Sequence, residues 1–181
     1  MIALGLILSL VALAGKRMEI KDLTSSKFQA ASIGRVRPLA DGETYARMGE
    51  GAKRIEVYSF KTGKQIGVLL DVDDIKDDRI ASIEGFEVSP QGKYLLIQTN
   101  TQPIYRHSKT ATYYIYSVAD HRLAPLSDIG DQQTPLFSPD GKYIAFVRDN
   151  DIYLKNYLNA LEETRVTTDG RRNEVINGIP D

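Results

Sequence analysis

The sequence predicts an all-β protein, a partial β-propeller preceded by an apolar N-terminal segment. Two segments share the pattern Ser-Pro-x-Gly-Lys-Tyr, and their serines, Ser89 and Ser138, stand 49 residues apart. Repeats of roughly 40 to 50 residues built from short strands are typical of propeller blades. Short strand-like segments also alternate with turn residues at spacings of roughly 8 to 12 residues, and no long amphipathic helix interrupts them. A β-sandwich has similar strands but would not repeat this pattern at blade spacing.

The first residues are almost wholly apolar and indicate export. Met1 to Gly15 is apolar and is followed by two basic residues. A membrane-spanning helix needs about 20 apolar residues, so this length favours the core of a signal peptide. No basic residue precedes Ile2, so a secretory signal, an uncleaved anchor and a buried apolar helix remain alternatives. We expect residues 1–15 to be a signal or anchor, and the protein to be periplasmic, membrane-associated or extracellular.

The segment that follows leads into the propeller. Residues 16–51 are polar and interrupted by glycine and proline, which predicts an entry segment with one or two short strands. Residues 55–60 alternate, residues 61–64 have turn chemistry and residues 65–70 are again apolar, which predicts a β-hairpin. Incomplete propeller blades are expected over residues 52–181.

The two similar segments, residues 86–97 and 136–146, each predict a strand, a tight turn and a returning strand. Proline presets φ in such a turn and glycine supplies a positive φ. The tyrosine and aliphatic residues that follow suit a pleated sheet. Further strands are expected at 112–118 and 152–157, and further turns at 119–122 and 149–151.

Composition excludes several classes of function. The chain has 181 residues, of which 42% are hydrophobic and 26% charged, as expected of one folded domain. The net charge of -1, with both signs interspersed, provides no basic stripe for nucleic acid. The absence of cysteine excludes disulfides, thiolate metal sites and a cysteine nucleophile. No cofactor is indicated.

One stretch is more specific than a generic propeller. From Arg106 to Tyr116 the sequence contains Arg-His-Ser-x-x-Ala-x-Tyr-x-x-Tyr, and it resembles the same segment of the dipeptidyl peptidase IV family. The resemblance covers roughly residues 20–181 and is strongest after Gly85. Further matches follow in the same order at residues 137–142, 145–153, 166–170 and 177–181.

The resemblance implies a fold and an activity for the whole protein. In this family an eight-bladed propeller lies over an α/β-hydrolase domain, and a Ser-His-Asp triad removes N-terminal dipeptides whose second residue is usually proline or alanine. This sequence contains no Gly-x-Ser-x-Gly elbow. The family segment Asp-Trp-Val-Tyr-Glu-Glu, whose glutamates hold the substrate amine, is matched only through Asp181. We therefore expect the first two to three blades, without catalytic residues.

The same resemblance implies binding partners. It implies peptide substrates with a free N-terminus, an α/β-hydrolase domain of the same chain, and a homodimer of the full-length protein. A non-catalytic propeller-type binding module or a scaffold remains an alternative. Continuation of the coding sequence into Trp-Val-Tyr-Glu-Glu and a later Gly-x-Ser-x-Gly elbow would favour the peptidase.

Arg106 is the candidate substrate-binding residue. The resemblance implies that its side chain points into the central cavity and donates hydrogen bonds to a substrate carbonyl. A guanidinium suits this role because it is permanently charged and offers its donors in a planar fork. By spacing alone, an arginine after a strand is more often a solvated surface residue.

The other polar residues favour structural interpretations. No serine or carboxylate is placed to work with His107, and His121 stands beside Asp120 in an expected Asx-type turn. An acidic run lacks the glycine and the closing glutamate of a calcium loop, so we interpret it as a solvated loop. Its members are Asp71, Asp73, Asp74, Asp77 and Asp78. Three strand tyrosines are expected to pack within blades, namely Tyr94, Tyr143 and Tyr153.

Overall fold

A computed structural model describes residues 18–25, 34–75, 77–106, 108–158 and 162–179 of the chain. The expected signal or anchor, His107 and Asp181 lie outside the described residues. The chain divides into two units, Met1–Ile33 and Gly34–Asp181. The described part of the first unit is one short helix, α1 (Ile20–Thr24), which begins with a capping box between Glu19 and Asp22. No helix within the described ranges is long and apolar enough to cross a membrane.

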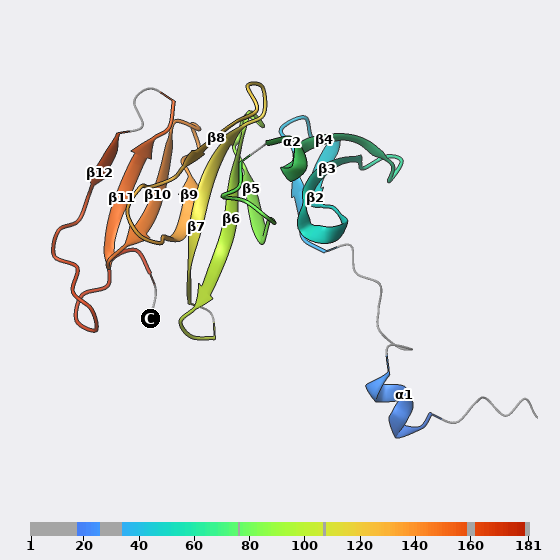
Figure 1. Cartoon of the computed structure of the whole chain (residues 1–181), viewed down its shortest axis with the longest axis horizontal. Coiled ribbons are helices and arrows are strands. Elements are labelled where there is room, and N and C mark those ends of the chain that lie inside the picture. The colour runs from blue at the N-terminus through green and yellow to red at the C-terminus, as the bar shows by residue number, and fades with distance from the viewer. Residues whose placement is uncertain (1–17, 26–33, 76, 107, 159–161, 180–181) are drawn as a thin grey trace, which may run out of the picture. The chain divides into compact units, whose positions relative to one another are not determined.

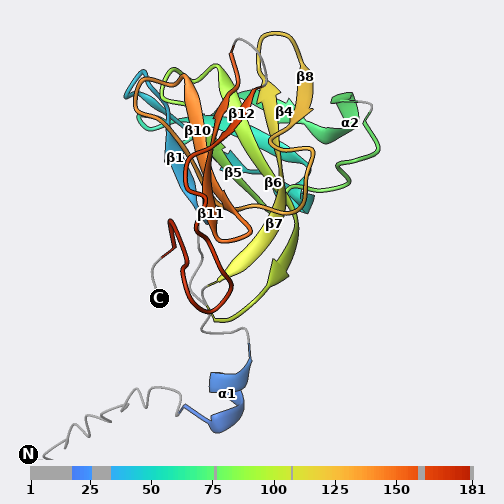
Figure 2. The same cartoon turned by 90° about the vertical axis from the view of Figure 1, so that its left-hand side faces the viewer.

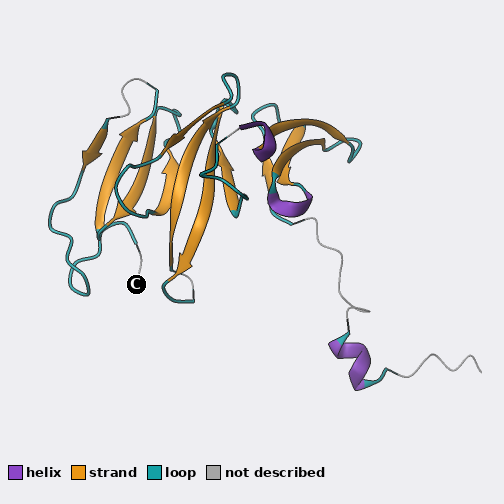
Figure 3. Ribbon diagram, in the orientation of Figure 1, coloured by secondary structure: helices purple, strands orange, loops and turns teal. Residues whose placement is uncertain are grey.

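In the second unit, the described residues form three four-stranded antiparallel sheets (Figure 1), whose strands are orange in Figure 3. Within each sheet, strands that follow one another along the chain are hydrogen-bonded neighbours. The first sheet contains β1 (Val36–Pro38), β2 (Thr44–Met48), β3 (Arg54–Ser59) and β4 (Gln65–Asp71). The second contains β5 (Gly85–Val88), β6 (Tyr94–Pro103), β7 (Lys109–Ser117) and β8 (Arg122–Pro125). The third contains β9 (Gln133–Phe137), β10 (Tyr143–Arg148), β11 (Asp151–Asn156) and β12 (Glu163–Arg165). Two short helices, η2 (Glu50–Ala52) and α2 (Val72–Ile75), lie between strands.

The repeated Ser-Pro-x-Gly pattern forms the same turn twice. The Ser89 N–H donates to the Tyr94 carbonyl at 2.9 Å, and the Gly92 N–H donates to the Ser89 carbonyl at 2.8 Å. In the second copy the corresponding bonds of Ser138 and Gly141 are both 2.8 Å. Both serine hydroxyls accept the N–H of the tyrosine five residues later at 3.0 Å. The two glycines have φ of 70° and 67°, which explains why glycine occupies this position.

A third turn of this kind connects β1 to β2. The Leu39 N–H donates to the Thr44 carbonyl at 2.9 Å, and Gly42, with φ of 68°, donates to the Leu39 carbonyl at 3.1 Å. The Asp41 carboxylate accepts hydrogen bonds from both the N–H and the hydroxyl of Thr44. The first sheet therefore includes two short strands from the segment 16–51. The sequence pattern did not reveal this copy, because Leu39 replaces the serine.

The middle sheet buries both of its faces. Leu95 and Ile97 of β6 pack in a core cluster with Ile55 of the first sheet, whereas Leu96 packs in a second cluster with Phe146 of the third sheet. Because successive strand residues point to opposite faces, a continuous apolar run is required here. The three sheets accordingly overlap one behind another in the view of Figure 2.

Side-chain contacts join each sheet to the next one. The Gln91 side-chain amide, in the first Ser-Pro turn, donates to the Asp140 carbonyl in the second turn at 3.0 Å. An ion pair between Arg37 and Glu87 joins the first sheet to the second. Four-stranded antiparallel sheets that pack face to face with equivalent turns side by side are the blades of a propeller. The expected all-β, partial propeller is confirmed.

The packing role expected for one tyrosine is wrong. Tyr153 stacks on Phe146 at 5.6 Å between ring centres, and the ring of Tyr94 lies edge-on to Tyr157 at 5.0 Å. Tyr143, in contrast, remains 39% exposed. Ile144 and Phe146 point to the buried face of β10, and Tyr143, one residue away in the strand, points to the opposite face.

Two buried tyrosines predict a late alkaline titration. Burial, reinforced by Glu87, raises the pKa of Tyr113 to about 12, and burial, reinforced by Tyr94 and Asp140, raises the pKa of Tyr157 to about 12. A raised folded-state pKa gives stability that is complete below the unfolded value of about 10 and is lost as pH rises through 12. Ultraviolet titration of tyrosinate should therefore show late groups in the folded protein, Tyr113 and Tyr157 among them.

Matched variants test this assignment. Tyr113→Phe should remove one late-titrating group, whereas Tyr105→Phe, at a residue that is 80% exposed, should leave the late-titrating groups unchanged. A single transition near pH 10 for all ten tyrosines of the folded chain would contradict the assignment.

Candidate functional site

The central hairpin of the second sheet projects past its neighbours. Pairing of β5 with β6 ends at Gln98, and pairing of β8 with β7 ends at Tyr114. Beyond these points β6 and β7 continue together, and Figure 1 shows both running longer than β5 and β8. A bulge between Thr99 and Gln102 bends the hairpin, with Asn100 at φ of 52°.

Arg106 lies at the tip of this hairpin. The N–H groups of Ile104 and Tyr105 both donate to the Ser108 carbonyl, at 2.8 and 3.1 Å, and close the tip. Arg106 is exposed, and no other described residue forms a hydrogen bond or ion pair with its guanidinium. Its donors are therefore free to meet a ligand as far as the described chain is concerned.

A groove of about 740 Å³ lies beside the hairpin tip. One wall is the hairpin itself, with Tyr105 and Ser108, and another is the last described segment, with Arg172 and Ile176. Arg106 is not among the lining residues, although Tyr105 and Ser108 of the same tip are. The remaining lining residues come from the hairpin, from the strand ends of the third sheet and from the last segment: Ile104, Thr110, Asp131, Gln133, Arg148, Asp149, Asn150, Asn173 and Ile179.

The groove contains charges of both signs. Arg148 is buried, forms a 2.6 Å ion pair with Glu163 and lies over the Tyr153 ring at 4.0 Å. Burial lowers the pKa of Arg148, but hydrogen bonds to Tyr153 and Glu163 outweigh it and leave that pKa above its usual value. Asp131 accepts a hydrogen bond from the Thr112 hydroxyl at 3.2 Å. A peptide terminus, which combines a charged amine with carbonyl oxygens, is chemically suited to such a mixed surface.

The histidine that the structure describes, His121, forms a hydrogen bond with a tyrosine of the same hairpin. His121 stands in the turn between β7 and β8 with φ of 52°, and its Nδ1 lies 2.8 Å from the Tyr116 hydroxyl. Asp120 instead accepts a hydrogen bond from the Ser117 hydroxyl at 2.8 Å. The turn is as expected, but the tyrosine rather than the aspartate is the partner of His121. This turn is not part of the groove.

The acidic run consists of separate ion pairs. Part of it forms the helix α2, where a loop was expected, and three carboxylates each lie against a different basic side chain. No group of three or more potential ligands lies close enough to hold a metal ion within the described part of the chain. The Arg79 guanidinium lowers the pKa of Asp77 to about 2. The pairs are Asp71 with Arg54, Asp73 with Lys53 and Asp77 with Arg79.

Residues 89–181 match the model of the family described as the dipeptidyl peptidase IV N-terminal region. The chain belongs to this family. Its fold is similar to that of dipeptidyl peptidase 4 from Porphyromonas gingivalis, with a TM-score of 0.77, 38% identity and coverage of 87% of this chain and 22% of that one. This similarity supports the resemblance found around Arg106.

Curated relatives within the dipeptidyl peptidase IV family agree. The chain is 38% identical over 101 residues to dipeptidyl peptidase 4 of Felis catus, covering 55% of this chain and 13% of that protein. It is 34% identical over 143 residues to a probable dipeptidyl peptidase 4 of Aspergillus clavatus, covering 78% of this chain and 17% of that protein. The chain thus spans less than a fifth of the length of these relatives.

Proposed function

We propose that the chain is the N-terminal propeller region of a serine exopeptidase that releases N-terminal dipeptides with proline or alanine in the second position. Membership of the dipeptidyl peptidase IV family supports this function. An α/β-hydrolase domain of the same protein would supply the serine, histidine and aspartate, because this sequence contains no Gly-x-Ser-x-Gly elbow. The propeller region gates access and positions the peptide.

The observation that carries the substrate-binding role is the place of Arg106. The residue stands at the tip of a projecting hairpin, between two residues that line the 740 Å³ groove. Its guanidinium is exposed and unpaired among the described side chains. It would donate to a carbonyl oxygen of the bound dipeptide and fix the distance between the peptide N-terminus and the scissile bond.

We also propose that the protein is exported and is periplasmic, membrane-associated or extracellular. The almost wholly apolar residues 1–15, followed by Lys16 and Arg17, support this location. Fractionation of cells that express the full coding sequence should recover the protein outside the cytoplasm. Recovery in the cytoplasm alone would contradict export.

Substitution of Arg106 tests the function. In the full-length protein, Arg106→Ala should lower kcat/KM on a Gly-Pro chromogenic substrate by about tenfold or more, because a hydrogen bond from a charged donor contributes about 1.5–3 kcal/mol. Arg106→Lys should restore part of the loss, since it keeps the charge but not the planar fork. Steady-state kinetics with both variants provides the measurement.

Arg122→Ala is the matched control, because Arg122 is exposed at the start of β8 and is not among the groove residues. It should leave kcat/KM unchanged. An Arg106→Ala enzyme as active as the parent would remove the assigned role. A full-length protein that binds peptides but releases no dipeptide would instead favour the non-catalytic binding module.

A further inference from the structure

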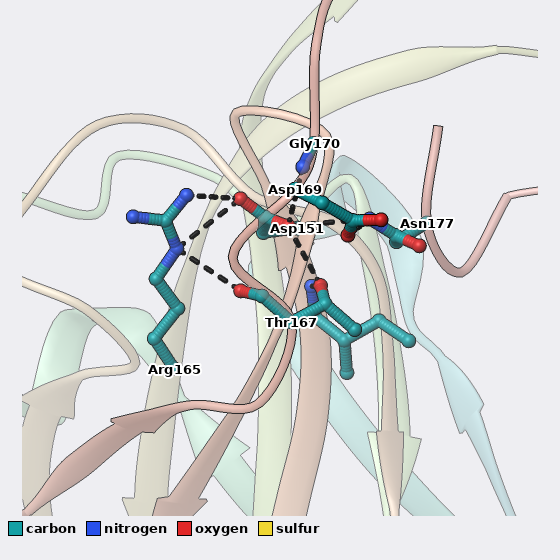
Figure 4. Close-up of polar contacts among 7 residues, drawn as sticks. Asp151, Arg165, Thr167, Asp169, Gly170 and Asn177 are labelled. Carbon is teal, nitrogen blue, oxygen red and sulfur yellow. Dashed lines mark hydrogen bonds and ion pairs between the residues drawn. The ribbon is translucent and has the colours of Figure 1, made fainter. Parts of the chain in front are cut away.

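One buried carboxylate accepts hydrogen bonds from several donors of the last described segment (Figure 4). Asp151, at the start of β11, has a side chain that is 0% exposed. Its Oδ1 accepts from the Thr167 hydroxyl at 2.7 Å, from the Gly170 N–H at 3.0 Å and from the Asn177 side-chain amide at 3.2 Å. Its Oδ2 accepts from the Arg165 guanidinium, with Nε at 3.1 Å. All of these donors come from residues 165–177.

The segment depends on this carboxylate because it has little regular structure of its own. Beyond β12, its pairing within the described chain is the local bridge between Arg171 and Val175. Backbone bonds join it to the third sheet at its two ends, from Val166 to Ile152 at 2.8 Å and from Asn177 to Asn150 at 3.0 Å. Between those ends, the bonds to Asp151 hold it, together with one bond from the Ile152 N–H to the Thr167 hydroxyl oxygen at 2.9 Å.

Close packing at Gly170 requires glycine at this position of the segment. A Cβ at Gly170 would lie 2.5 Å from the Asn150 carbonyl oxygen and 2.8 Å from Cγ of Asp151. Any larger residue would push the segment away from the carboxylate. Glycine at this position therefore allows the backbone N–H to reach Asp151.

The anchored segment is one wall of the groove. Arg172, Asn173, Ile176 and Ile179 line the groove together with Tyr105 of the hairpin. None of these four contributes a hydrogen bond to Asp151. The side chains of these four residues thus line the groove, while residues 165, 167, 170 and 177 bind Asp151 and hold the backbone in place.

We propose that Asp151 is a positioning residue for peptide binding, because its buried carboxylate holds residues 165–178 as the groove wall that faces the Arg106 hairpin. This inference rests on the proposed dipeptidyl peptidase function. Asp151 touches no substrate itself. Burial raises its pKa, but the hydrogen bonds from Arg165, Thr167 and Gly170 outweigh burial, so the pKa lies below its usual value and the carboxylate is ionised at neutral pH.

The decisive variant is Asp151→Asn in the full-length protein. The amide has the same shape, but it loses the charge that Arg165 faces and replaces one acceptor by a donor. KM for a Gly-Pro chromogenic substrate should rise about tenfold while kcat stays within about twofold, because a loosened wall weakens ground-state binding. A purely structural defect would reduce the active fraction and lower kcat at unchanged KM.

Hydrogen exchange supplies a second readout that needs no activity. In Asp151→Asn the amide of Gly170 should exchange about tenfold faster or more, while the amides of β6 and β7 keep their protection. Thr167→Val removes one donor to Asp151 and also the acceptor of the Ile152 N–H, while Arg165, Gly170 and Asn177 still donate to the carboxylate, so it should give a smaller change in the same direction. Thr167→Ser retains the hydroxyl and should behave like the parent. This pair keeps the test open if Asp151→Asn does not fold.

Asp140→Asn is the matched control. Asp140 is in the same sheet, but it is exposed in the turn between β9 and β10, where it accepts from Ser138 and Lys142. It should leave both KM and exchange at residues 165–178 unchanged. Unchanged exchange at Gly170, or an unchanged KM, in both Asp151→Asn and Thr167→Val would overturn the inference. If the parent protein releases no dipeptide, the proposed function fails, and exchange at Gly170 alone decides whether Asp151 holds the wall.

Discussion

Replacing Phe146 by alanine is expected to lower the free energy of unfolding by about 3–5 kcal/mol. The side chain is 1% exposed, stacks on Tyr153 and belongs to the cluster that joins the second and third sheets. The variant loses the favourable burial of the ring, and it leaves a cavity between the two sheets. The sheets cannot move together freely enough to fill this cavity. Urea unfolding of the chain, followed by circular dichroism, measures it.

Phe60→Ala is the matched control, because it removes the same ring at a position that is 52% exposed. Phe60 contacts Tyr45 at 4.7 Å between ring centres, so its loss should cost no more than about 1.5 kcal/mol. Equal losses for Phe60→Ala and Phe146→Ala would show that the contact between the second and third sheets contributes little to stability.

Replacing Arg148 by alanine is expected to cost about 3–5 kcal/mol of unfolding free energy. Its side chain is 7% exposed and its guanidinium pairs with Glu163, whose side chain is 19% exposed. Removal of the guanidinium leaves this carboxylate without its ion pair, which connects β10 to β12 across the intervening strand β11. It also removes the cation that lies over the Tyr153 ring.

Two comparisons isolate the cause of this effect. Arg171→Ala removes the same side chain from an exposed ion pair with Glu174, and it should cost about 0.5 kcal/mol or less. The double variant Arg148→Met with Glu163→Gln removes both charges and should recover most of the stability lost in Arg148→Ala. If the double variant is as unstable as Arg148→Ala, the cause is not the unpaired carboxylate but the loss of the other guanidinium contacts, which include hydrogen bonds to the Ser127 hydroxyl and the Ile129 carbonyl.

The fold could be predicted in large part because its signals are local. Proline at one position and glycine two residues later determine the turn at Ser89 and again at Ser138, so the repeat was visible in the sequence. The turn at Gly42 has the same geometry, but Leu39 replaces the serine, and its only local signal is Asp41-Gly42. The interpretation of Tyr143 failed because a strand pattern does not reveal which face is covered.

The candidate site was less accessible to prediction. Arg106 was singled out only by its resemblance to a family motif, and its substrate-binding role remains a prediction. No sequence signal indicated Asp151, whose donors lie between 14 and 26 residues further along the chain. The same is true of Arg148, which sequence alone presents as an ordinary charged residue at the end of a strand.

The sequence by itself determined the class of fold, the repeat and the family, because strand alternation, turn chemistry and a motif are properties of neighbouring residues. Tertiary structure decided which carboxylate is buried, which arginine is paired and which segments form the groove. These depend on which distant donors fold onto Asp151 and how far the β6–β7 hairpin extends past its sheet. Burial and pairing arise from contacts between segments, and spacing within one segment does not encode them.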